Sequence, residues 1–146
     1  MRIWMHFIIT AILAATLYPF YNWMVAFLFV GAILVDSDHV LWYWFKHKQF
    51  SPTKTFKYCT DIEKYSDIKE YKGAIMIFHT WDALLISFII ALFSNIFLMI
   101  FIGLAVHLIC DFLYSYKLFK GFNFQYLFKK SSIKFLWKKY ILTTKQ

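Results

Sequence analysis

Residues 22–45 read NWMVAFLFVGAILVDSDHVLWYWF, a stretch that is apolar over most of its length and carries ionisable side chains near its end. A helix needs about 20 apolar residues to cross the ~30 Å hydrocarbon core of a bilayer. Charges inside that core cost ~2.5–3.5 kcal/mol on insertion scales, so Asp36, Asp38 and His39 are expected to be paired or functional. The stretch therefore predicts a transmembrane helix that contains a polar site.

The composition of the whole chain agrees with a membrane location. Hydrophobic residues make up 61% of the 146 positions, aromatic residues 23%, and the mean hydropathy is +0.55. A soluble domain of this length cannot bury so much apolar surface. Further apolar runs at 3–18, 74–93 and 96–116, separated by Pro19 and Asn22 and by Ser94-Asn95, complete the pattern. We predict an all-α polytopic membrane protein whose residues 1–116 form a four-transmembrane-helix bundle, followed by a tail at 117–146.

The lysines predict the orientation of this bundle. The loop from Lys46 to Lys72 carries seven lysines and the tail carries eight, whereas the turns at 19–21 and 94–95 carry none. Positively charged flanks remain cytoplasmic. We therefore expect a protein of the cytoplasmic (inner) membrane with both termini and the central loop on the cytoplasmic side.

Basic residues in the tail alternate with Phe, Trp, Tyr and Leu. This pattern predicts amphipathic segments that lie in the membrane interface and contact anionic lipid head groups. Although the net charge of the chain is +8, this arrangement of basic residues does not favour nucleic acid as a binding partner.

Histidine and aspartate side chains fall at one depth of the predicted bundle, in the cytoplasmic leaflet. Residues three or four apart share a helix face, which pairs His107 with Asp111, His79 with Asp82, and Asp36 with His39. Asp38 would face the same site only if the helix unwinds nearby. The candidate metal ligands are His6, Asp36, Asp38, His39, His79, Asp82, His107 and Asp111.

A nitrogen and oxygen ligand set without thiolate suits Zn²⁺, Mn²⁺ or Fe²⁺. We expect a divalent metal, with zinc preferred, as one to three ions that carboxylates could bridge. One of Asp36 and Asp38 is expected to orient a ligand histidine through its other ring nitrogen. A single His–Asp pair is also compatible with a structural hydrogen bond, but such pairs on three helices at one depth favour metal.

At these residues the chain resembles the YdjM-like family of membrane-bound metal-dependent hydrolases. The resemblance rests on the run Val35-Asp36-Ser37-Asp38-His39, the early His6, a later His79, and the spacing Gly103-x-x-x-His107-x-x-x-Asp111. The family has proline where this chain has Val35, and its His-Arg-Gly-x-Thr-His-Ser segment is replaced by residues 78–82, without the arginine. The family is in turn similar to zinc-dependent phospholipase C and P1 nuclease, from which only the roles of His107 and Asp111 carry over.

The resemblance implies metal-assisted hydrolysis, with Asp82 or Asp36 as the base that accepts a proton from water. The depth of the site favours a membrane lipid, such as a phospholipid or polyprenyl phosphate, as the substrate. Lysines at the helix ends (Lys46, Lys72 and Lys117) would attract an anionic head group. The alternatives are a metal-handling protein, a scaffold held by metal, and a haem electron carrier that uses the histidines as axial ligands.

Overall fold

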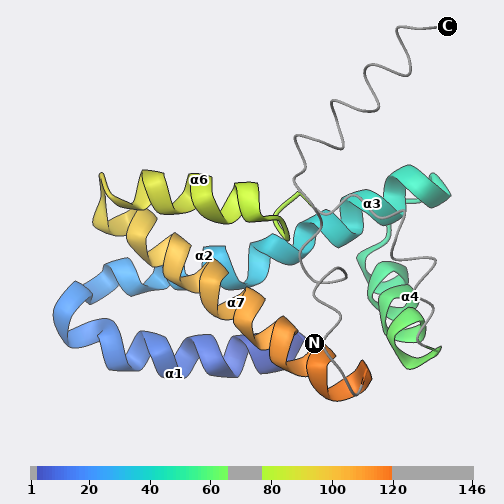
Figure 1. Cartoon of the computed structure of the whole chain (residues 1–146), viewed down its shortest axis with the longest axis horizontal. Helices are drawn as coiled ribbons and strands as arrows, with labels where there is room; N and C mark the ends of the chain where they lie inside the picture. Colours follow the sequence, from blue (N-terminus) through green and yellow to red (C-terminus); the bar gives the residue numbers. More distant parts are fainter. Residues whose placement is uncertain (1–2, 66–76, 120–146) are drawn as a thin grey trace, which may run out of the picture.

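The computed structural model describes residues 3–65 and 77–119. Its elements in chain order are α1 (Ile3–Tyr21), η1 (Asn22–Ala26), α2 (Phe27–Ile33), η2 (Leu34–Asp36), α3 (Ser37–His47), α4 (Pro52–Tyr65), α6 (Trp81–Ala91) and α7 (Asn95–Phe119), as Figure 1 shows. The described residues contain helices and no strand, which confirms the all-α prediction. Most of the predicted tail at 117–146 lies outside the described residues.

Two helical stretches, Trp4–His47 and Asn95–Tyr114, are long and apolar enough to cross a membrane. Within the first stretch the chain reverses direction at η1, so that α1 and α2 lie side by side (Figure 1). The reversal occurs at Asn22, whose φ of 50° is left-handed. Asparagine tolerates this conformation and commonly ends helices. Pro19 was predicted to break the first helix but lies inside α1.

Helix α7 is the centre of the bundle and packs against α1, α2 and α6 (Figure 1). Its closest neighbour is α2, because glycines let the two backbones approach. A Cβ on Gly31 would collide with the carbonyl oxygen of Ile100, and one on Gly103 would collide with that of Leu28. Close approach at small residues is typical of helices that associate in membranes, where burial of apolar surface gives little driving force.

Helix α6 begins later than the predicted span at 74–93. Thr80 is its N-cap: the backbone is extended there, and its hydroxyl accepts a hydrogen bond from the amide of Ala83 at 3.3 Å. The acidic Asp82 in the first turn suits the positive end of the helix dipole. His79 was predicted to lie inside this helix on the same face as Asp82, and that prediction was wrong because the cap places His79 in the turn before the helix.

The predicted cytoplasmic loop contains a helix, α4, which packs against α3. Its Tyr58 ring contacts Trp42 and Tyr43 at centroid distances of 5.6 and 5.5 Å, and its hydroxyl accepts a hydrogen bond from Lys46 Nζ at 2.9 Å. The Lys46 ammonium also lies over the Trp42 ring, 5.2 Å from its centroid. Tyr58 therefore anchors α4 to the last two turns of α3.

Replacing Tyr58 by alanine is expected to release α4 from α3, because the aromatic contacts and the bond from Lys46 are lost together. Aromatic pairs contribute about 0.5–1.5 kcal/mol beyond their buried area. Amide hydrogen exchange over residues 52–61 should accelerate about tenfold or more, while exchange in α7 stays unchanged. Unchanged exchange in α4 would show that other contacts hold it. Tyr58→Phe, which removes only the hydroxyl, should have a smaller effect.

Candidate metal centre

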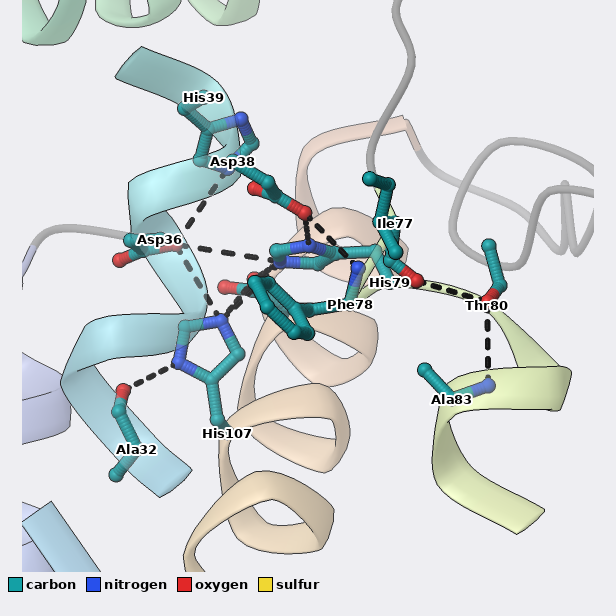
Figure 2. A network of polar contacts seen from close by, with 11 residues as sticks. Ala32, Asp36, Asp38, His39, Ile77, Phe78, His79, Thr80, Ala83 and His107 are labelled. Atoms are coloured by element: carbon teal, nitrogen blue, oxygen red, sulfur yellow. Dashed lines mark hydrogen bonds and ion pairs between the residues drawn. The ribbon is translucent and has the colours of Figure 1, made fainter. Parts of the chain in front are cut away.

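A network of buried and half-buried histidines and aspartates lies where four parts of the fold meet: the first turns of α1, the junction of α2 with α3, the turn before α6, and α7. Figure 2 shows much of this network, with His79 and His107 pointing toward one another from different segments. The structure brings seven of the eight predicted ligands into it through His–Asp and His–His contacts, namely His6, Asp36, Asp38, His39, His79, His107 and Asp111.

The 3-10 turn η2 explains why Asp36 and Asp38 both face the network. On an uninterrupted α-helix, residues two apart point in different directions. Here the helix tightens over Leu34–Asp36 before α3 begins. Such interruptions inside a helix commonly occur at functional positions. Asp38 was expected to face the site only if the helix unwinds nearby, and η2 is such an interruption.

Both central histidines have their Nδ1 atoms occupied by acceptors. His107 Nδ1 lies 2.7 Å from the carbonyl oxygen of Ala32, and His79 Nδ1 lies 3.0 Å from Asp38 Oδ2. A carbonyl and an ionised carboxylate can only accept, so each Nδ1 donates a hydrogen. In the neutral rings the Nε2 atoms are then left unprotonated, with their lone pairs available to a metal ion.

The two Nε2 atoms face each other at 3.3 Å. Asp111 Oδ2 lies 3.2 Å from His107 Nε2 and 3.7 Å from His79 Nε2. Asp36 Oδ1 completes the group, 3.5 Å from His107 Nε2 and 4.0 Å from His79 Nε2. A tetrahedral zinc site with bonds of ~2.0–2.1 Å has ligand–ligand edges of about 3.3–3.4 Å. The observed separations bracket this value, so the buried Asp/His group could hold a divalent metal ion.

His6 supports this group from the side. Its Nε2 lies 3.2 Å from Asp111 Oδ1, the oxygen that faces away from the two central histidines. Its ring stacks on that of His107 with a centroid distance of 4.0 Å and an interplanar angle of 18°. His6 is only 3% exposed. It therefore restrains both Asp111 and His107.

Asp38 and His39 contact the group from the side of α3. Asp38 Oδ2 accepts hydrogen bonds from His79 Nδ1 and from the backbone amide of Phe78 at 3.2 Å. His39 Nε2 lies 3.4 Å from Asp36 Oδ1. Of the two carboxylates near η2, Asp38 is thus the one that orients a histidine through its second ring nitrogen, as one of the pair was predicted to do.

Asp82 lies half-buried in the first turn of α6. Among the described residues, two groups of atoms could hold a metal ion, and Asp82 belongs to neither. Its roles as ligand and as base stay predictions.

Sequence reasoning did not identify the backbone groups that orient the histidines. The Ala32 carbonyl and the Phe78 amide fix His107 and Asp38 respectively. The residue type at either position carries no signal of this role, because every residue has the same backbone groups. Only the close α2–α7 packing brings the Ala32 carbonyl within reach of His107.

Comparison with known proteins found no matching family model, no matching curated protein and no matching solved structure. The resemblance to the YdjM-like hydrolases therefore stays a hypothesis carried by short motifs.

Proposed function

We propose that the protein is a membrane-embedded, metal-dependent hydrolase that cleaves a phosphoester or ester bond of a lipid at the cytoplasmic face of the inner membrane. The observation that supports this most is the convergence of two histidine lone pairs and two carboxylate oxygens on one point. The donor set suits zinc, and Mn²⁺ and Fe²⁺ accept the same ligands. In this proposal the chain is a distant member of the YdjM-like hydrolases.

We infer four membrane crossings, with the site in the cytoplasmic half of the bilayer. The exposed side chains of α6 are large and apolar, as expected for a surface in contact with lipid (Leu85, Ile86, Phe88 and Ile89). At 1.5 Å per residue, α6 extends about 16 Å, and α7 extends about 18 Å from Asn95 to His107. If both begin from a shared outer turn, these lengths cover a little more than half of a ~30 Å hydrocarbon core. This depth suits the phosphate or ester linkage of a lipid that enters from the cytoplasmic leaflet.

The residues have separable tasks in this proposal. The cation is held by four residues, His79, His107, Asp111 and Asp36. Asp38, His6 and the Ala32 carbonyl keep the ligands oriented. When bound, a divalent cation lowers the pKa of water toward ~7 and neutralises charge on the attacked phosphoryl or acyl oxygen. Exposed lysines on α4, Lys54 and Lys57, supply positive charge that attracts anionic head groups.

The two carboxylates predicted as the general base can now be separated by experiment. Asp36 supplies one of the four converging atoms, so Asp36→Asn should lower both metal content and lipid hydrolysis. If Asp82 is the base, Asp82→Asn should keep the metal and lower the hydrolysis rate by about 10²–10⁴-fold. Elemental analysis and a lipid phosphate-release assay in mixed micelles measure the two properties.

A metal-free wild-type protein would contradict the proposal. It would indicate instead a buried hydrogen-bond network in which a shared proton lies between His79 and His107. A protein that holds metal but hydrolyses no lipid would be a scaffold or a metal-handling protein. A haem-dependent carrier would show a Soret band after purification.

A further inference from the structure

We propose that His39 and Asp38 hold a second divalent cation beside the first, with Asp36 shared between the two ions. This inference rests on the proposed metal centre and concerns the number of ions and the charge of the substrate. Its starting point is one carboxylate oxygen that the contacts described above leave unexplained.

Asp38 is 1% exposed, and within the part of the chain that the structure describes only one of its two oxygens has hydrogen-bond partners. Its Oδ2 accepts from Phe78 and His79, but its Oδ1, although buried, has no hydrogen-bond partner among the described residues. Buried polar atoms nearly always have a partner, and an unpaired carboxylate oxygen is costly in an apolar interior. An ion bound at Oδ1 would remove that cost.

The ligands around Asp38 fit a cation. Ligand atoms of Asp38, His39 and His79 lie within 4.8 Å of one another. Since His79 donates its Nδ1 hydrogen to Asp38 and presents Nε2 to the first ion, we assign the second ion to His39 Nε2 and the Asp38 carboxylate. Figure 2 shows His39 and Asp38 side by side at one end of the network.

Asp36 lies between the two groups. Its Oδ1 is 3.4 Å from His39 Nε2 and 3.5 Å from His107 Nε2, so one carboxylate is nearly equidistant from a ligand of each ion. Paired catalytic metal ions are held ~3.5–4 Å apart and stabilise both the attacking and the leaving oxygen of a displacement. A shared carboxylate between two histidines suits that spacing.

The charges of the network agree with two ions and an anionic substrate. Three carboxylates face the metal positions, those of Asp36, Asp38 and Asp111. His79 and His107 would be neutral when their Nε2 atoms coordinate an ion, because a ligand nitrogen carries no hydrogen. One divalent cation leaves a net negative charge, which repels a phosphate. Two cations leave a net positive charge, which an anionic phosphoester neutralises. A two-ion site therefore favours lipid phosphoesters over uncharged lipid esters.

Asp38→Asn tests the second ion selectively. The amide oxygen can still accept from Phe78 and His79, whereas the amide nitrogen takes the place of Oδ1 and cannot coordinate a cation. After saturation with Mn²⁺ and removal of excess ion, the full-length wild-type protein in detergent should hold about two ions per chain and the variant about one. Asp61→Asn, the same change at an exposed position of α4, should keep about two.

Electron paramagnetic resonance gives a second readout that does not depend on the variant folding. Two Mn²⁺ ions ~3.5–4 Å apart are magnetically coupled, so the saturated wild-type protein should show a coupled spectrum in place of the six-line signal of an isolated ion. A wild-type protein with one ion, an uncoupled spectrum, or two ions in Asp38→Asn would overturn the inference. One ion per chain with intact lipid hydrolysis would overturn the second ion and leave the proposed function standing. Two coupled ions without lipid hydrolysis would support the second ion and contradict the proposed function.

Discussion

His107→Ala is expected to abolish metal binding, with a loss of affinity of more than ~100-fold. His107 Nε2 lies within 3.5 Å of the three other candidate ligand atoms, those of His79, Asp36 and Asp111. Mutating residues that only orient a ligand typically costs 10–100-fold in metal affinity, so removal of a ligand should cost more. Competition with a fluorescent chelator on the purified protein would measure the change.

The control for this variant is His47→Ala, the same substitution at an exposed histidine of α3 outside both groups of candidate ligands. It should leave metal affinity unchanged. Because His107→Ala also removes the bond to Ala32, Asp111→Asn provides a second variant of nearly equal volume, in which the amide oxygen can still contact His6. Retention of metal by both variants would disprove the assignment of the centre.

Gly103→Val is expected to destabilise the protein by more than about 3 kcal/mol and to remove the metal as well. Overpacking of a close-packed interior typically costs ~1–3 kcal/mol, and here the added atoms meet backbone that cannot rotate away. A Cβ at this position would collide with the Leu28 carbonyl and lie 3.1 Å from the Ala32 amide nitrogen. Helix propensity alone would favour most replacements of glycine, so a loss of stability identifies the close approach as its cause.

Metal content should fall together with stability, because Asp36 follows α2 whereas His107 and Asp111 lie on α7. Separation of these helices would move the two halves of the centre apart. Thermal unfolding in detergent and elemental analysis measure both effects. Ile109→Ala, which changes the side chain by the same number of carbons on an exposed part of α7, should alter either property little. Equal effects of the two substitutions would contradict the role of the glycine contact.

The sequence by itself predicted the helical class and which polar residues gather, for reasons that are local. Apolar length is visible in any window of the chain, and the cost of a charge in an apolar helix makes each buried His or Asp conspicuous. Spacings of three and four residues correctly placed His39 beside Asp36 and Asp111 beside His107. Four short polar segments could therefore be expected to meet before their contacts were known.

The tertiary structure alone decided the part that each residue plays. Asp36 and Asp38 differ because η2 rotates one toward His107 and the other toward His79. His79 left its predicted helix because Thr80 caps α6, and the Ala32 carbonyl reaches His107 because Gly31 and Gly103 permit a close crossing. These outcomes depend on contacts between residues far apart in the chain. The side chains of one segment do not determine which residues of another segment will pack against them.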